Sequence, residues 1–186
     1  MKKQIRQGVF ETNSSSIHTI TIFNGDGYKE NMKRCKSVYF DAGQYGWEEE
    51  TYSNDAGYLW TGMVTSGRYN EEELVKFELE AAEILAKYGI ECEFAPWEVK
   101  KDDDYEYTDF KKNSWYDSTP YVDHSFELYD LFDYIFNIDG SIDEEHFLRY
   151  LFNSEVKTGN DNCDSGYRLL DEARETTNAY VIIKGN

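Results

Sequence analysis

The two most strand-like segments of this chain lie close to its opposite ends, and this placement constrains the fold more than any other feature. Residues 17–23 read IHTITIF and residues 179–184 read AYVIIK, so both segments are rich in β-branched and apolar side chains. Segments of this composition form buried strands. Terminal strands with helical patterns between them predict a single α+β domain over residues 1–186. We expect a mostly antiparallel sheet that includes both terminal strands, with a group of helices packed on it.

The clearest helical pattern lies between these strands. Asn70 can cap a helix that begins after it, and Glu73 can complete a capping box. Gly89 follows the end of the pattern, where a glycine commonly terminates a helix. The apolar side chains that recur at helical spacing, and so predict one buried face, are Leu74, Phe77, Ala81, Ile84, Leu85 and Tyr88.

Three further helices are expected in the second half of the chain. Residues 125–138 carry a broad apolar face, and Ser141 with Glu144 forms a second capping-box pattern that opens a helix through Phe152. The short connection between these two helices predicts an αα-hairpin. A shorter helix is expected over residues 167–174.

The remaining segments predict strands and loops. Residues 37–40 and 90–94 alternate or carry β-branched side chains, and we expect 37–40 to lie next to the first strand. Residues 41–69 mix glycines with tyrosines and tryptophans and predict long aromatic loops or short hairpins. Residues 100–120 have no persistent period and predict a second long aromatic loop, which connects the halves of the domain.

Composition excludes several functional classes. The chain has 186 residues, with 19 Lys and Arg against 37 Asp and Glu, so its net charge is −18. Proteins that bind DNA or RNA generally need clustered cations, so direct general nucleic-acid binding is disfavoured. No apolar run is long enough for a membrane helix, and no apolar secretory segment follows the first basic residues. We therefore expect a cytoplasmic protein with no membrane partner.

No motif in the sequence predicts a cofactor or metal. Cys35, Cys92 and Cys163 are far apart, and His124 and His146 lack the spacing of a zinc site. The sequence also contains no phosphate-binding Walker loop, no dinucleotide glycine pattern and no nucleophile elbow. We therefore expect reduced thiols, no metal and no cofactor.

One segment near the start, RQGVFETNSSSIH, combines Arg6, the hydroxyls of Ser14, Ser15 and Ser16, and the imidazole of His18. In a functional interpretation, Arg6 binds an anion, the serines donate hydrogen bonds and His18 is a general acid or base. In a structural interpretation, the polar side chains bond to nearby backbone and His18 is hydrogen-bonded inside a sheet. The structural interpretation is favoured because local spacing fixes no partner carboxylate or metal ligand.

A second polar segment, FNSEVKTGNDN, follows the helix that ends at Phe152. Its composition predicts a tight turn. Asp161 with Asn160 or Asn162 offers the oxygen ligands that Mg²⁺ and Ca²⁺ prefer, but the spacing does not match a twelve-residue calcium loop. A solvated turn is therefore the simpler interpretation.

Acidic residues are concentrated between Asp123 and Leu148, where eight occur without a Lys or Arg. Helical spacing places several of them on one side, so they form an exposed negative stripe. In one interpretation the stripe only favours solubility. In the other, the stripe and the acidic loops mimic nucleic-acid phosphates and dock in a basic channel, with aromatic anchors. The predicted binding residues are Glu48, Glu49, Asp102, Asp103, Tyr105, Trp115, Asp123, Glu127, Asp130 and Asp133.

The two polar segments also carry a resemblance. The pattern R-x-G-x-F-E-T-N-S-S-S-x-H runs from Arg6 to His18, and F-N-S-E…T-G-N-D-N runs from Phe152 to Asn162. Together they resemble small phage and mobile-element proteins of Gram-positive bacteria, some of which resemble inhibitors of type II-A CRISPR nucleases. The resemblance implies a phage anti-CRISPR protein in the host bacterial cytoplasm. Its implied partner is the RNA-guided nuclease or its guide complex, and no catalytic residue is carried over.

Three functional hypotheses follow. The leading one is a non-enzymatic anti-CRISPR protein that binds a type II effector nuclease, with or without guide RNA, and blocks DNA binding or cleavage. The alternative is an enzyme, either a nuclease or a nucleotide-modifying transferase. Its catalytic site would combine Arg6, Ser14, Ser15, His18 and Asp161. A third is a phage structural or assembly protein.

Overall fold

The computed structural model describes residues 16–102, 105–112, 119–124, 128–160 and 164–184. Within these ranges the chain forms ten strands and six helices. In chain order they are β1 (Ser16–Phe23), α1 (Gly27–Arg34), β2 (Ser37–Phe40), β3 (Gln44–Tyr45), β4 (Glu50–Ser53), α2 (Ala56–Thr65), α3 (Glu71–Ala86), β5 (Glu91–Phe94), β6 (Trp97–Asp102), β7 (Tyr105–Phe110), β8 (Tyr121–Val122), α4 (Tyr129–Ile135), α5 (Glu144–Phe152), β9 (Ser154–Asn160), α6 (Asp164–Glu175) and β10 (Ala179–Lys184).

The predicted α+β class and the pairing of terminal strands are confirmed. Four strands form an antiparallel sheet in the order β10-β1-β9-β4, so the first and last strands of the chain are neighbours. His18 on β1 lies opposite Lys184 on β10 and Thr158 on β9. The polar end of β1 is therefore inside the sheet and not at its edge.

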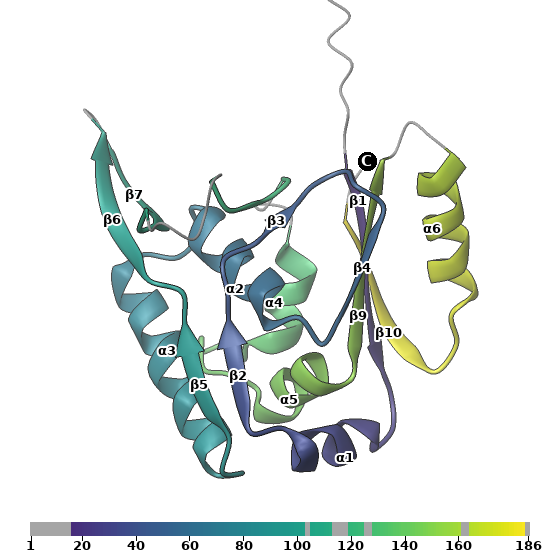
Figure 1. The fold of residues 1–186 in the computed structure, drawn as a ribbon, viewed down its shortest axis with the longest axis horizontal. Helices are drawn as coiled ribbons and strands as arrows, with labels where there is room; N and C mark the ends of the chain where they lie inside the picture. Colours follow the sequence, from purple (N-terminus) through teal and green to yellow (C-terminus); the bar gives the residue numbers. More distant parts are fainter. Residues whose placement is uncertain (1–15, 103–104, 113–118, 125–127, 161–163, 185–186) are drawn as a thin grey trace, which may run out of the picture.

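Helices cover both faces of this sheet (Figure 1). The helix α6 packs against β1, β9 and β10 on one side, whereas α2, α4 and α5 lie on the other. Farther from the sheet, the parallel pair β2–β5 and the long helix α3 form an outer layer. Residues 16–22 are buried because β1 has a strand on each side and helices on both faces.

The prediction of a tight turn over FNSEVKTGNDN is wrong for residues 154–160, which form β9 between β1 and β4. Pairing on both sides outweighs the turn preference of these residues. The two buried hydroxyls are satisfied: Ser154 donates to the Tyr150 carbonyl at 2.6 Å, and Thr158 donates to the Glu48 carbonyl at 2.5 Å. Asp161 and Asn162 lie outside the described residues.

The prediction of aromatic loops over residues 41–69 is also wrong in part, because Ala56–Thr65 form the helix α2. Every residue from Ala56 to Val64 is buried, so α2 has no polar face and therefore no amphipathic period to recognise. Gly57 and Gly62 lower the helix propensity further. Gly62 is suited to its position because an added Cβ would meet the buried Leu128 side chain.

Several neighbours and boundaries also differ from the predictions. The strand β2 pairs in parallel with β5 and not with β1. Within the predicted loop at 100–120, residues 100–102 and 105–110 belong to the strands of the hairpin β6–β7, while residues 113–118 lie outside the described ranges. The helix α1 was not predicted. The helix α5 is capped by Asp143, which accepts from the His146 amide at 3.0 Å, and not by Ser141.

Other predictions hold. The helix α3 has the predicted capping box, with Asn70 accepting from the Glu73 amide and Glu73 accepting from the Asn70 amide. Gly89 follows α3 with a φ of 69°, in the region that favours glycine. The helices α4 and α5 pack together as expected, and α6 covers the predicted range 167–174.

An aromatic cluster fills the space between α3 and the rest of the core. Phe77 is at its centre, with ring centroids of Phe40, Trp60, Phe94, Phe136 and Phe147 within 5.8–6.1 Å. The Phe77 side chain is 2% exposed. This cluster attaches α3, and the surface that α3 carries, to the rest of the molecule.

We predict that Phe77→Ala lowers the free energy of unfolding by about 3–5 kcal/mol, because it leaves a cavity among five aromatic rings. Leu79→Ala on the same helix is the matched control, since Leu79 is 62% exposed, and it should cost less than about 1 kcal/mol. Urea unfolding followed by tryptophan fluorescence measures both. Equal losses for the two variants would contradict this assignment of the core.

Candidate functional site

His18 is fully buried on β1, and both of its ring nitrogens are hydrogen-bonded within the protein. Nε2 lies 3.0 Å from the Gly46 carbonyl oxygen and Nδ1 lies 2.8 Å from the Tyr58 hydroxyl. A carbonyl can only accept, so Nε2 carries the proton and Nδ1 accepts from Tyr58. Burial, and next the charge of Lys184, lower the pKa of His18 from 6.5 to about 3. The imidazole is therefore neutral at pH 7 and has no free nitrogen for acid–base chemistry.

The other residues of the predicted catalytic set are not brought together in the described part of the chain. Arg6, Ser14, Ser15 and Asp161 all lie outside the described residues. Ser16, the first residue of β1, is buried, and its hydroxyl oxygen is 3.4 Å from the Lys184 ammonium. His18 thus fits the structural interpretation, whereas the Ser16 hydroxyl contacts a distant lysine side chain and not nearby backbone.

A polar network that sequence reasoning missed continues from His18 toward α2. Asp55 caps α2, and its Oδ1 accepts from the amides of Gly57 at 2.8 Å and Tyr58 at 3.3 Å. Its Oδ2 accepts from the Tyr45 hydroxyl at 3.0 Å, and burial raises the pKa of the Asp55 carboxyl. The Tyr150 hydroxyl donates to the Asp55 carbonyl at 2.8 Å. An aspartate just before an apolar run was the available signal, but no glutamate follows to complete a capping box.

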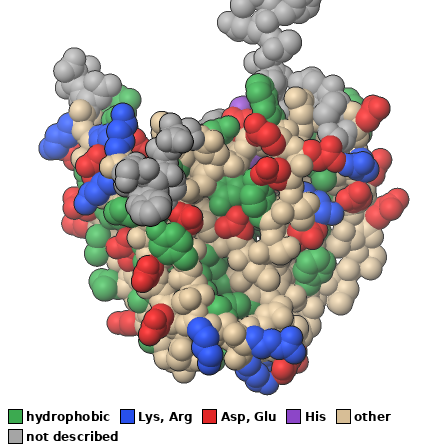
Figure 2. Space-filling model, in the orientation of Figure 1, with side chains coloured by type: hydrophobic (Ala, Val, Ile, Leu, Met, Phe, Trp, Pro, Cys, Tyr) green, Lys and Arg blue, Asp and Glu red, His purple; other side chains and the backbone are tan. Residues whose placement is uncertain are grey.

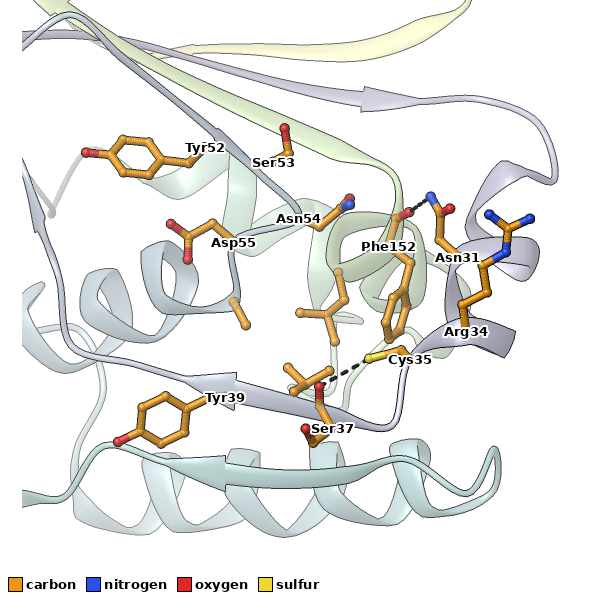
Figure 3. Close-up of a pocket in the computed structure, with 13 residues that line it drawn as sticks. Asn31, Arg34, Cys35, Ser37, Tyr39, Tyr52, Ser53, Asn54, Asp55 and Phe152 are labelled. Carbon is orange, nitrogen blue, oxygen red and sulfur yellow. Dashed lines mark hydrogen bonds between the residues drawn. The ribbon is translucent and has the colours of Figure 1, made fainter.

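Asp55 also lines a cavity of about 610 Å³ between α1, β2, β4 and the ends of α2 and α5 (Figure 3). Asn31 and Arg34 lie at one end of the cavity, and Tyr39 and Tyr52 lie at the other. His18, the one described residue of the predicted catalytic set, is not among the residues that line this cavity.

The predicted binding residues that the structure describes lie on several different elements. Glu48 and Asp123 lie near Tyr121, and both negative charges raise the pKa of that tyrosine, although burial is the largest cause. Glu49 forms an ion pair with Arg168 of α6. Asp130 and Asp133 are exposed on α4.

Tyr105 is the predicted binding residue of the hairpin whose side chain the structure describes. Tyr105 is 61% exposed, and its ring lies 5.5 Å from that of Tyr107. Asp102 ends β6, and its side chain is not described. The predicted binding residues outside the described ranges are Asp103, Trp115 and Glu127.

Some carboxylates and tyrosines that are far apart in the sequence nevertheless lie together on one face of the structure. A groove of about 650 Å³ between the hairpin β6–β7 and the start of α3 is lined by Glu71, Glu72, Tyr105 and Tyr107. A hollow of about 240 Å³ between α3 and α4 is lined by acidic residues that include Asp133. Both depressions share Arg68 and Tyr69, so they are neighbours. We call this surface the acidic face and define it as Glu71, Glu72, Glu73, Tyr105, Tyr107, Asp133 and Asp139.

The carboxylates of the acidic face are largely uncommitted. Within the described residues, Glu71, Glu72 and Asp133 form no ion pair. Arg68 lies 3.8 Å from the ring centroid of Tyr129 and forms a cation–π contact there. Figure 2 shows carboxylates at the left of the molecule, where α3 and the hairpin lie in Figure 1, and also at the right, near α6. Negative charge is therefore widespread, and the acidic face adds depressions and tyrosines to it.

The described residues offer neither a metal site nor a membrane-spanning helix. No group of three or more His, Cys, Asp or Glu side chains in this part of the chain is placed to hold a metal ion. His146 stacks on Tyr134 at 4.2 Å, and the His124 ring lies 3.7 Å from the Asp123 carboxylate. None of the described helices has the length and apolar content that crossing a membrane requires.

The buried His18 predicts a specific pH dependence of stability. Its pKa is lower in the folded state than in the unfolded state, so the unfolded chain binds the proton first as pH falls. Stability from this residue is therefore complete above pH 6.5 and is lost between about pH 6.5 and 3. Between pH 7 and pH 5 the loss is about 2 kcal/mol.

Urea unfolding of the wild type and of His18→Gln at pH 7 and pH 5 measures this contribution of His18 to the free energy of unfolding. The glutamine can still donate to the Gly46 carbonyl but does not titrate, so the variant should lose less stability over this pH range. The carboxylates titrate in both proteins and cancel in the comparison. Equal pH dependence in the two proteins would show that His18 is not buried as described.

Comparison with known proteins gives no relative from which a function can be transferred. No protein-family model, curated protein or solved structure matches this chain. The resemblance to phage proteins based on the two motifs therefore stays a prediction. Because folds host many unrelated functions, the fold of this chain does not by itself indicate its function.

Proposed function

We propose that this protein acts by binding and not by catalysis, as an anti-CRISPR inhibitor whose acidic face docks in a basic channel of a type II RNA-guided nuclease. Such nucleases hold their nucleic acid in positively charged channels. The observation that carries the proposal is the grouping of Glu71, Glu72 and Asp133 with Tyr105 around two adjoining depressions.

The unpaired carboxylates support this proposal electrostatically. Glu71 and Glu72 are exposed in the first turn of α3, and Asp133 is exposed on α4. Because they form no ion pair among the described residues, these carboxylates are available to a partner's cations. With a net charge of −18, the whole molecule would also be drawn toward a cationic channel by long-range attraction.

The tyrosines supply contacts that charge alone does not. Tyr105 and Tyr107 lie on the hairpin, and Tyr105 is more than half exposed beside the groove. Tyrosine is enriched at the energetically dominant positions of protein interfaces because it buries a large ring and keeps a polar hydroxyl. The acidic face thus combines charge for attraction with rings for short-range packing.

The buried histidine weakens the enzyme alternative. A general acid or base must reach its substrate and must exchange a proton near working pH. His18 is fully buried, both nitrogens have partners, and its pKa is about 3. His18 therefore supports a structural role, which leaves surface recognition as the better-supported function.

The charge requirement predicts that a triple variant, Glu71→Gln, Glu72→Gln and Asp133→Asn, binds the guide-loaded nuclease at least about tenfold more weakly in 0.1 M salt. It should also show a weaker dependence of affinity on salt concentration. The matched control neutralises three exposed acids on α6, as Asp164→Asn, Asp171→Asn and Glu175→Gln, and should change affinity less than about twofold. If the two triple variants lose affinity equally, the binding depends only on the net charge of the protein. That result would refute a specific role for the acidic face.

The anchor role of Tyr105 has a separate test. Tyr105→Ala should weaken binding at least about tenfold without lowering the thermal unfolding temperature, because the ring is 61% exposed. Tyr167→Ala is the control, since Tyr167 is 65% exposed on α6, and it should bind like the wild type. Surface plasmon resonance with immobilised nuclease measures both. Wild-type affinity of Tyr105→Ala would remove the hairpin from the proposed interface.

A further inference from the structure

The cavity between α1, β2 and β4 exposes the edge of a strand. Three consecutive residues of β2, Ser37, Val38 and Tyr39, line it (Figure 3). Successive side chains of a strand point to opposite faces, so three in a row at one cavity indicate that the strand edge faces it. The strand β2 has a described partner, β5, on its other side.

The hydrogen bonds between β2 and β5 show which backbone groups are already used. The Glu91 amide donates to the Lys36 carbonyl at 3.0 Å, and the Ala95 amide donates to the Phe40 carbonyl at 2.9 Å. In a parallel pair, every second residue of a strand bonds to the same neighbour. Lys36, Val38 and Phe40 therefore direct their backbone groups toward β5.

By the same alternation, Ser37 and Tyr39 direct their backbone N–H and C=O groups away from β5 and toward the cavity. Within the described residues, the Ser37 carbonyl accepts from the Cys35 thiol, with a donor–acceptor distance of 3.2 Å. The Ser37 N–H and both backbone groups of Tyr39 have no protein partner there. Unpaired strand-edge groups of this kind are the template to which an added strand binds.

The charge beside this edge is opposite to that of the whole protein. Residues 29–36 read KENMKRCK, with four cations and one acid, in a chain whose net charge is −18. Arg34 lines the cavity and forms no ion pair in the described part of the chain. Figure 2 shows blue side chains gathered at the lower edge of the molecule, where α1 lies in Figure 1. An acidic group is therefore the favoured neighbour for Arg34.

The rest of the lining suits an apolar side chain and leaves one carboxylate already satisfied. Ala56, Leu151 and Phe152 contribute apolar surface. Asp55 is the acid among the lining residues, and its oxygens accept from two α2 amides and from Tyr45. The hydrogen-bonding capacity of Asp55 is therefore used by donors within the protein.

We propose that this cavity binds an extended, acidic peptide segment of a partner protein. The segment adds a third strand to the β2–β5 pair through the backbone groups of Ser37 and Tyr39. One of its apolar side chains packs on Leu151 and Phe152, and one of its carboxylates pairs with Arg34. This site is separate from the acidic face, and it does not depend on the identity of the partner proposed for that face.

Three labelled hexapeptides test the proposal by fluorescence polarisation with the full-length protein. The first alternates valine with glutamate, and the second alternates valine with lysine. The third repeats the first with methyl groups on alternate backbone nitrogens, which removes the donors for one edge. We expect the glutamate peptide to bind at least tenfold more tightly than either of the others.

Matched variants locate the peptide on the protein. Arg34→Gln should weaken binding of the glutamate peptide at least fivefold, whereas Lys33→Gln should change it less than twofold. Both residues are cations of α1, but Lys33 is paired with Glu30 and does not line the cavity. Equal losses would show that general attraction to α1 is responsible and would overturn the proposal.

Amide hydrogen exchange gives the most direct readout of strand addition. With saturating glutamate peptide, exchange of the Ser37 and Tyr39 amides should slow at least tenfold, while that of Val38, already bonded to β5, should change little. Three results would overturn the proposal: no binding of the glutamate peptide up to millimolar concentration, equal binding of its methylated form, or unchanged exchange at Tyr39.

Discussion

Complete burial of α2 is the constraint on which the rest of the structure depends. The helix lies between the central sheet and the outer β2–β5 layer, so its polar groups must find partners inside the protein. Asp55 bonds the amides at its start, Tyr58 bonds His18, and the Trp60 indole donates to the Ala95 carbonyl at 3.2 Å. Among the described side chains, no buried nitrogen or oxygen lacks a hydrogen-bond partner. His18 is one of these partners, and the hydrogen bond between its Nδ1 and the Tyr58 hydroxyl joins β1 to α2.

The exterior of the molecule carries two surfaces of opposite character. The acidic face concentrates carboxylates and tyrosines where the hairpin, α3 and α4 meet. The cavity beside α1 has the opposite character, because a cation lies next to an unpaired strand edge. The molecule therefore presents two surfaces of opposite charge on one well-packed core.

Sequence patterns predicted the elements whose signals are local. The capping box at Asn70 and Glu73 is determined within one helical turn, and the apolar period of α3 follows from its single buried face. The run at 17–23 has strand propensity strong enough to be recognised alone. His18 was correctly considered as a residue hydrogen-bonded inside a sheet, because its neighbours in sequence already predicted that sheet.

The missed elements depend on distant partners. The strand β9 has turn-like residues and becomes a strand because β1 and β4 pair with it on both sides. The helix α2 is apolar all around, so no periodicity distinguishes it from an aromatic loop. The acidic face was predicted only in part: Tyr105 and Asp133 were among the predicted binding residues, whereas Glu71 and Glu72 were not. Only packing places Glu71 and Glu72 at the same groove as Tyr105.

The most direct test of binding without turnover is a stoichiometric titration. The protein would be added to a fixed amount of guide-loaded type II nuclease, while DNA cleavage and guide integrity are followed on the same gel. An inhibitor that acts by occupying a channel reaches complete inhibition near one molecule per nuclease and leaves the guide intact. Inhibition by trace amounts, accompanied by a cleaved or modified guide or nuclease, would show that the protein is an enzyme.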